Sequence, residues 1–157
     1  MFSFMKKEKI LSSVAGGRIV TLAKVPDEVF SQKLLGDGFA VIPTNGNIYS
    51  PADGTITDVT DTLHAYCITT SDGLEILVHI GIDTVELKGE CFTALVKQGD
   101  PIRRGEAIAY ADIDGIREKG YNPATMVVVT NTHKMKEYRV VESNSQSAGA
   151  PALTYKL

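Results

Sequence analysis

Residues 61–89 read DTLHAYCITTSDGLEILVHIGIDTVELKG and contain two runs that are apolar or alternate in polarity, separated by Ser-Asp-Gly at 71–73. An Asp-Gly pair between such runs is typical of a β-hairpin, because a tight turn needs residues that tolerate positive φ. The stretch therefore predicts two antiparallel strands. These strands carry two of the three histidines, His64 and His79.

The type of turn decides how the two histidines are placed. A two-residue Asp-Gly turn would pair Tyr66 with His79. His64 would then lie one diagonal step from His79, about 7–8 Å away at Cα, and both imidazoles could converge on one small group. Cys67 would face the other way. A three-residue loop over 71–73 would shift the register by one and put the histidines on opposite faces, so a site built from both depends on the turn.

The composition is that of an ordinary globular protein. The chain has 157 residues, a net charge of −3, 43% hydrophobic residues and 22% charged residues, which suits one domain with its own core. It has no basic stripe, so we expect no nucleic-acid binding. No run approaches the roughly 20 apolar residues of a membrane-spanning helix, and Cys67 and Cys91 lack CxxC spacing. We expect a cytoplasmic protein with two reduced thiols.

From residue 18 onward, short apolar or alternating runs are separated by Gly, Pro, Asn and Asp. Many short strands with closely spaced turns indicate an all-β fold. We predict an antiparallel β-sandwich, or barrel-sandwich hybrid, with short helical turns near 28–35 and 113–119 and a polar loop over 143–151. The strands are expected at 19–22, 39–43, 47–50, 55–59, 64–70, 74–80, 91–96, 107–111, 126–129, 138–141 and 153–156.

The amino-terminal segment, residues 1–17, allows two interpretations. It could form a short amphipathic helix that acts as a weak interfacial membrane anchor, or a flexible tail that ends at the Gly-Gly pair 16–17. We predict the flexible tail, with at most weak peripheral membrane contact. The apolar side of the alternative helix would hold Met1, Phe2, Phe4, Met5, Ile10, Leu11 and Val14, and its basic side Lys6, Lys7 and Lys9.

Two histidines on one strand face predict a chemical function. Imidazole is a nucleophile at neutral pH, and its pKa lies near physiological values. The pair therefore suits phosphoryl acceptance, acid-base catalysis or metal binding. The third histidine, His133, has no visible partner in the sequence, and we expect it to be structural.

Residues 73–89, GLEILVHIGIDTVELKG, resemble the active-site signature of the glucose-type enzyme IIA of the bacterial phosphoenolpyruvate-dependent sugar phosphotransferase system. In that family the domain is an antiparallel β-sandwich that accepts a phosphoryl group from the carrier HPr and passes it to a cysteine of a IIB domain of the sugar permease. The resemblance implies an enzyme IIA domain over residues 18–157, which uses no cofactor. It extends through VPDEVF at 25–30, GDGFA at 36–40, SPADGTI at 50–56, GD at 99–100 and VVVTN at 127–131.

The resemblance also implies a role for each site residue. His79 would be the phosphorylated residue, through Nε2, and His64 would hydrogen-bond the phosphate. The hydroxyl of Thr62 would orient His64. The carbonyl of Gly81 would accept from His79 Nδ1–H and so fix the tautomer that leaves Nε2 free to attack.

An apolar rim around this site would form the docking face for HPr and the IIB domain. Leu77 is the strongest rim candidate, because it shares the face of His79, whereas some of the other apolar residues could belong to the core. Three acidic residues, Asp27, Asp83 and Glu86, fall beside the rim and could meet basic side chains on HPr. The apolar rim positions implied by the resemblance are Val29, Phe30, Leu34, Leu35, Leu77 and Val85.

Other functions remain open from the sequence. His64, His79 and Asp83 could hold zinc, but HxH and HExxH spacing is absent; in the resembled family a zinc ion can bridge both histidines when a partner supplies a carboxylate. The segments 51–56 and 96–108 resemble turns of lipoyl and biotinyl carrier domains, whose flattened β-sandwich agrees with the predicted fold, and 134–136 (Lys-Met-Lys) loosely resembles a biotinylation site. Relatives also inhibit permeases or kinases when unphosphorylated, so a regulatory module is a third alternative.

Overall fold

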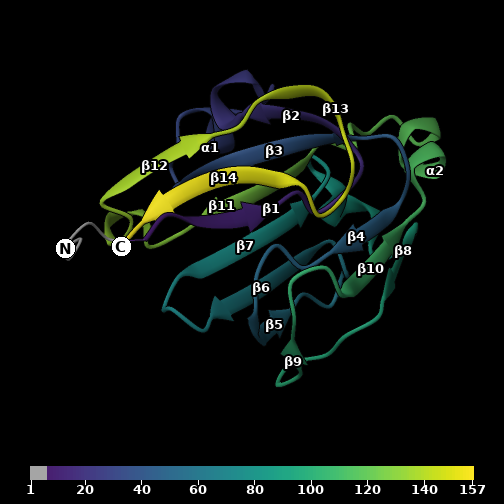
Figure 1. Ribbon diagram of the computed structural model, residues 1–157. Coiled ribbons are helices and arrows are strands. Elements are labelled where there is room, and N and C mark those ends of the chain that lie inside the picture. The colour runs from purple at the N-terminus through teal and green to yellow at the C-terminus, as the bar shows by residue number, and fades with distance from the viewer. Residues whose placement is uncertain (1–6) are drawn as a thin grey trace, which may run out of the picture.

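The computed structural model describes residues 7–157, and the regular secondary structure of this part of the chain is mostly β-strand (Figure 1). Two short α-helices, α1 (Glu28–Ser31) and α2 (Ile113–Glu118), and three 3-10 turns, η1 (Leu22–Lys24), η2 (Thr84–Leu87) and η3 (Thr132–Lys134), join the strands. The strands are β1 (Lys9–Ser12), β2 (Gly17–Thr21), β3 (Asp37–Pro43), β4 (Asn47–Tyr49), β5 (Gly54–Val59), β6 (Ala65–Thr70), β7 (Glu75–Ile80), β8 (Phe92–Ala94), β9 (Pro101–Ile102), β10 (Ala107–Ala111), β11 (Thr125–Val129), β12 (Glu137–Val140), β13 (Ser143–Gln146) and β14 (Pro151–Lys156).

The strands form one large sheet and two small ones. The large sheet has the order β13-β2-β3-β11-β7-β6-β5-β9, and the small sheets have the orders β1-β14-β12 and β4-β10-β8. The pairings are antiparallel, and the main core cluster combines side chains from all three sheets. The predicted antiparallel β-sandwich with two short helices is confirmed.

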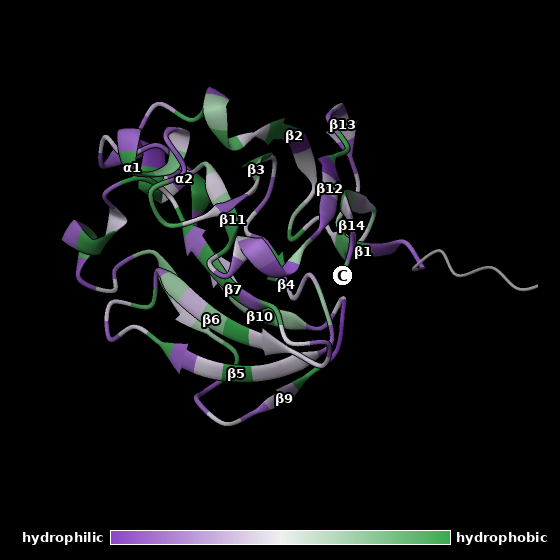
Figure 2. Cartoon of the chain, turned by 90° about the vertical axis from the view of Figure 1, so that its left-hand side faces the viewer, coloured by the Kyte–Doolittle hydropathy of each residue, from purple (hydrophilic) through white to green (hydrophobic). Residues whose placement is uncertain are grey.

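The large sheet buries apolar residues on both faces near β7. Ile76, Val78 and Ile80 point into the main core between the sheets. On the opposite face a second cluster includes Met126 and Phe30. Figure 2 shows bands of hydrophobic residues along the strands of the large sheet. Because successive side chains of a strand alternate between faces, the odd-numbered residues of β7 lie on the side of the second cluster.

The β6–β7 hairpin has a three-residue loop, which is the second of the two turns that the sequence allowed. His79 pairs with Ala65 instead of Tyr66. The carboxylate of Asp72, inside the loop, accepts hydrogen bonds from Thr70 Oγ1 at 2.5 Å and from the hydroxyl of Tyr155 at 2.5 Å. Tyr155 belongs to β14, so a contact from a distant strand helps to select the turn.

Part of the segment expected to be flexible forms a strand. Residues 9–12 are β1, which pairs with β14, and Leu11, Val14 and Ala15 are fully buried. The described part of 1–17 is therefore neither a free tail nor the side of a helix, because its apolar residues enter the core. Expectations for Met1, Phe2, Phe4, Met5 and Lys6 lie outside the described residues. Within residues 7–157, no helix has the length and apolarity needed to cross a membrane.

The remaining differences from the predicted elements lie at sheet edges. Residues 143–146, expected in a polar loop, form β13 and pair with β2, and β9 is not among the expected strands. Both expected helices form, and α1 begins as predicted: the carboxylate of Asp27 accepts from Val29 N–H at 2.9 Å. This capping bond satisfies one of the free amides of the first turn.

Candidate active site

His79 lies near the end of β7, and its ring is oriented by the backbone just beyond the strand. His79 Nδ1 lies 2.8 Å from the carbonyl oxygen of Gly81. A carbonyl can only accept a hydrogen bond, so Nδ1 carries the hydrogen. In the neutral ring, Nε2 then holds the free lone pair, and no hydrogen bond to it is formed by residues 7–157. The ring is therefore prepared to act as a nucleophile at Nε2.

The turn after β7 needs a glycine at position 81. Gly81 has φ of +85°, and a Cβ there would lie 2.4 Å from Thr84 Cγ2. Thr84 itself is buried and donates from its hydroxyl to the carbonyl of Ile80, while Gly81 N–H donates to Ala124 O at 2.9 Å. These bonds hold the Gly81 carbonyl in place for His79.

His64 reaches the same site from an irregular segment. It precedes β6, and its carbonyl accepts from Ile80 N–H at 2.7 Å. Continued strand geometry would turn the His64 ring toward the core, on the side of Ile80. Leu63, however, has φ of +60°, and the chain leaves the strand there.

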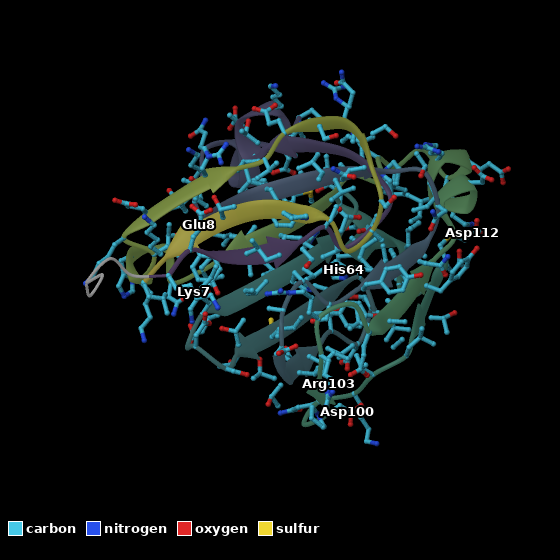
Figure 3. All side chains as sticks on the ribbon, viewed as in Figure 1. Lys7, Glu8, His64, Asp100, Arg103 and Asp112 are labelled. Carbon is cyan, nitrogen blue, oxygen red and sulfur yellow. The ribbon has the colours of Figure 1, made fainter. Side chains whose placement is uncertain are left out.

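The rings of His64 and His79 are therefore brought together despite the shifted register. Their centroids are 4.8 Å apart and the planes meet at 84°. The prediction that a three-residue loop would separate the two histidines is wrong, because His64 lies outside the regular part of β6. Figure 3 labels His64 among the strands, well away from Lys7 and Glu8.

Two hydroxyls lie beside Nδ1 of His64. Thr62 Oγ1 is 2.7 Å from this nitrogen, as the resemblance implied, and Thr60 Oγ1 is 3.4 Å from it. Sequence reasoning missed Thr60. The pattern Thr-x-Thr-x-His over 60–64 was the signal that could have indicated it, since alternate hydroxyls precede the histidine.

Burial keeps both imidazoles neutral at pH 7. It lowers the pKa of His64 to about 4, with a further lowering from the charge of His79; the His64 residue is only 6% exposed. Burial also lowers the pKa of His79, against the opposing effects of the Gly81 carbonyl and the carboxylates of Asp27 and Asp83. Neutral imidazole is the form that can attack an electrophile.

The predicted rim residues divide into two that are buried or half-buried on the face of His79 and four that are exposed. Phe30 is 5% exposed, and its ring centroid lies 5.0 Å from that of His79. Leu77 is half-buried on the face of His79, as predicted. The exposed positions are Leu34 at 66%, Val85 at 46%, Leu35 at 43% and Val29 at 42%.

The three acidic candidates occupy the turns around the site. Asp27 caps α1 and is half-buried, while Asp83 and Glu86 are exposed at and after the start of η2. Asp27 and Asp83 lie close enough to His79 for their charges to act on its pKa. They give the site a negative border.

Cys67 lies on another face than expected, and His133 lies away from the site. Cys67 pairs with Leu77 and shares the face of His79, half-buried, because the register is shifted by one. His133 is exposed in η3. This turn lies beside the β6–β7 loop, because the side chain of Asn131, two residues before His133, donates to Gly73 O at 3.0 Å. It therefore lies at the other end of β7 from His79.

The described residues offer no complete metal site. Within residues 7–157, no three His, Cys, Asp or Glu side chains are grouped so as to hold a metal ion. His64 and His79 supply two nitrogens at most, so an accessory zinc ion at this pair would need a ligand from a partner.

Comparison with known proteins identifies the family. The family described as phosphoenolpyruvate-dependent sugar phosphotransferase system, EIIA 1, matches residues 8–135. The chain is 39% identical over 147 residues to the glucose-specific EIIA component of Halalkalibacterium halodurans, covering 94% of this chain and 85% of that protein. The structure is similar to that of a glucose permease IIA from Mycoplasma capricolum, with a TM-score of 0.88, 31% identity and coverage of 98% and 99% of the two chains.

Some relatives are much longer. The chain is 47% identical over 136 residues to the glucose-specific EIICBA component of Streptococcus pneumoniae serotype 4, which covers 87% of this chain but 19% of that protein. The resemblance seen in the sequence to the glucose-type enzyme IIA is confirmed. The chain belongs to the EIIA 1 family of the phosphoenolpyruvate-dependent sugar phosphotransferase system.

Proposed function

We propose that this chain is a phosphocarrier: it accepts a phosphoryl group from phospho-HPr on Nε2 of His79 and transfers it to the cysteine of a IIB domain of a sugar permease. The observation that carries the proposal is the bond from His79 Nδ1 to the Gly81 carbonyl, which leaves Nε2 free beside a second imidazole. Membership of the EIIA 1 family supports the same chemistry.

In the acceptance step, Nε2 of His79 attacks the phosphorus of the phosphohistidine on HPr. The new N–P bond forms as the N–P bond of the donor breaks, and the histidine of HPr leaves with the electron pair. Such a transfer mainly requires that donor and acceptor are aligned and that the charge on the phosphoryl oxygens is stabilised. Neutral His79, held in one tautomer, supplies the aligned lone pair.

His64 stabilises the phosphoryl group. If Thr62 donates its hydroxyl hydrogen to His64 Nδ1, the ring carries its hydrogen on Nε2 and can donate to a phosphoryl oxygen. The low exposure of His64 strengthens this charge-assisted bond, because little water competes for it.

In the onward step, the cysteine thiolate of the IIB domain attacks the phosphorus and Nε2 of His79 leaves. The hydrogen bond from His64 offsets the charge that accumulates on the phosphoryl oxygens during this step. His64 therefore acts on transfer more than on acceptance. We place the relay in the cytoplasm, where HPr and the IIB domain meet the carrier.

The predicted apolar rim residues, four of them exposed, form the proposed docking face for both partners. A protein that binds two partners in turn needs an apolar centre that excludes water during transfer. Asp27, Asp83 and Glu86 border this centre and suit basic side chains on HPr, which mainly raises the encounter rate and sets the orientation. The docking face consists of Val29, Phe30, Leu34, Leu35, Leu77 and Val85.

We also propose that the folded enzyme IIA unit extends beyond residues 18–157 on its amino-terminal side. β1 pairs with β14 and places Leu11 in the main core. Residues 9–12 therefore belong to the same body as the site.

Reconstitution of the relay tests the proposal. The chain is incubated with phosphoenolpyruvate, enzyme I and HPr, and a purified IIB domain is then added. We expect one acid-labile phosphate per chain, present only when HPr is included and discharged to the IIB cysteine on addition of the IIB domain. A chain that stays unlabelled while HPr becomes fully phosphorylated would contradict the proposal.

A further inference from the structure

The hydroxyl of Thr60 lies beside His64, but the relay as described gives it no role. Thr60 directly follows β5, and its Oγ1 is 3.4 Å from His64 Nδ1. The same oxygen accepts from Ala65 N–H at 3.2 Å and donates to the Ala65 carbonyl at 3.3 Å. One hydroxyl thus contacts the ring of His64 and both backbone polar groups of the next residue.

The backbone of Thr60 closes the same loop. Thr60 N–H donates to Ala65 O at 3.1 Å, and Thr60 O accepts from Leu63 N–H at 2.9 Å. Leu63 is the residue with φ of +60°. A leucine in this left-handed conformation is unfavourable on its own, so the surrounding hydrogen bonds must hold it.

The position of the His64 ring depends on this loop. The carbonyl of His64 is paired with Ile80, whose side chain lies in the core. A regular strand through 60–65 would direct the His64 ring toward the core as well. The ring reaches His79 because the chain departs from strand geometry between Thr60 and Ala65.

We propose that Thr60 is a positioning residue of the relay, whose hydroxyl holds the 60–65 loop in the conformation that sets the ring of His64 against His79. Thr62 binds the ring nitrogen at 2.7 Å, whereas the shortest contact of the Thr60 hydroxyl is to the backbone of Ala65. The two threonines have different roles: Thr62 selects the tautomer of the His64 ring, and Thr60 fixes the position of that ring. The inference rests on the proposed function, because the placement of His64 matters for transfer only if His79 carries the phosphoryl group.

The Thr60→Val substitution tests this role, because valine keeps the β-branched shape and removes only the hydroxyl. It leaves the N–H of Ala65, a residue that is 5% exposed, without its partner. We expect the kcat of transfer to the IIB domain to fall about fivefold to tenfold, which corresponds to the loss of one hydrogen bond. The KM for the IIB domain and the rate of acceptance from phospho-HPr should change less than about twofold.

A spectroscopic measurement separates positioning from a general loss of stability. In the wild-type protein, the ¹⁵N spectrum of the imidazoles should show His64 as one tautomer. In Thr60→Val the displaced ring should lose its bond to Thr62 and show a mixture of both tautomers, and Thr60→Ser should restore the single tautomer and the rate. Thr55→Val is the matched control, since Thr55 is an exposed threonine of β5 with no hydrogen bond from its side chain among residues 7–157.

If Thr60→Val does not fold, Thr60→Ser and Thr60→Ala give the same comparison, because they also differ by one oxygen. The inference is overturned if the variants without the hydroxyl keep both the wild-type transfer rate and the wild-type spectrum, or if Thr60→Ser is as defective as they are. A wild-type chain that accepts no phosphate would contradict the proposed function instead, and the ¹⁵N spectra would then decide alone whether Thr60 positions His64.

Discussion

The two histidines of the site lie 4.8 Å apart but are held by different kinds of structure. His79 belongs to a regular strand, and its Nδ1 contacts the carbonyl of Gly81, which can only accept. His64 belongs to an irregular loop, and its Nδ1 contacts the hydroxyl of Thr62, which can donate or accept. In the proposed relay the two bonds have different results: the Gly81 carbonyl keeps the hydrogen of His79 on Nδ1, which suits a nucleophile, whereas the Thr62 hydroxyl donates to Nδ1 of His64 and leaves the hydrogen of that ring on Nε2.

The charges around the two rings and the exposure of the rings differ as well. Desolvation lowers the pKa of both rings, but only His79 has carboxylates, Asp27 and Asp83, that oppose the shift. His64 is almost fully buried and His79 is half-buried. The more accessible ring is thus the one with the fixed lone pair, and the enclosed ring is the one placed to support it.

Among the substitutions considered, removal of the His79 side chain should have the largest effect on phosphorylation. We expect His79→Ala to abolish phosphorylation by phospho-HPr, because His64 has no carbonyl partner to fix a free Nε2. The readout is incorporation of radiolabelled phosphate from phosphoenolpyruvate. His133→Ala, which removes the exposed histidine of η3, is the control and should be labelled normally. Normal labelling of His79→Ala would contradict the assignment of His79 as the phosphorylated residue.

Gly81→Ala tests how firmly the partner of His79 is held. The new Cβ would lie 2.4 Å from Thr84 Cγ2 at φ of +85°, so both strain and overlap oppose it. We expect a loss of about 3 kcal/mol in the free energy of unfolding by urea. Gly105→Ala is the control: Gly105 has φ of +84° and no atom within 4 Å of the new Cβ, so only the strain of about 1 kcal/mol remains. Equal losses would show that the Thr84 contact is unimportant.

His64→Gln separates acceptance from onward transfer. Glutamine can donate from its amide, but it lacks the ring that Thr62 orients, so its donor is held less firmly beside the phosphoryl group. We expect transfer to the IIB domain to slow about thirtyfold, the range for a hydrogen bond to a charged group. Acceptance from phospho-HPr should persist. Rapid-quench measurement of each half-reaction distinguishes the two steps, and an equal loss in both would assign His64 to acceptance as well.

The sequence predicted the strands that contain the site but not the register between them. The local pattern allowed a two-residue or a three-residue turn, and the contact of Asp72 with Tyr155 from β14, 83 residues away, favours the three-residue loop. A sequence window cannot show that contact. The histidines meet anyway, since the departure at Leu63 depends on the hydrogen bonds of Thr60, which also lie outside any periodic pattern.

The strands β1 and β13 could not be predicted from the sequence for a related reason. β1 is short, and its apolar residues gain a partner only from β14 at the other end of the chain. β13 reads SNSQ and has no apolar residue, so it forms by pairing with the edge of β2 and not by burial. The fold class and the candidates His64, His79, Thr62 and Gly81 came from the resemblance and the strand pattern, and the structure brings these four residues together.

The low pKa of His64 predicts a stability that depends on pH. Its pKa is about 4 in the folded protein against an ordinary histidine pKa of 6.5, so the unfolded chain binds more protons as the pH falls below about 6.5, and stability is lost from there down to about pH 4. We expect His64 to account for a loss of about 2 kcal/mol between pH 7 and pH 5. Urea unfolding at both pH values measures it. His64→Gln should lose correspondingly less over this range, and identical pH dependence in the two proteins would contradict the shift.

The smallest expected effect concerns the docking face. Leu34 is 66% exposed, and Leu34→Ala should raise the KM for phospho-HPr about fivefold, near 1 kcal/mol, through lost apolar contact. Leu95, 55% exposed beyond β8 and outside the proposed docking face, supplies the control Leu95→Ala. If Leu34→Ala and Leu95→Ala change the KM for phospho-HPr equally, Leu34 does not contribute to docking.

The position of the phosphorus atom tests the difference between the two rings most directly. The chain, labelled with ¹⁵N in its histidines and phosphorylated through HPr, can be examined for coupling between ³¹P and each imidazole nitrogen. We expect coupling to Nε2 of His79 alone, because the Gly81 carbonyl keeps the hydrogen on Nδ1. Coupling to Nδ1 of His79, or to either nitrogen of His64, would contradict it.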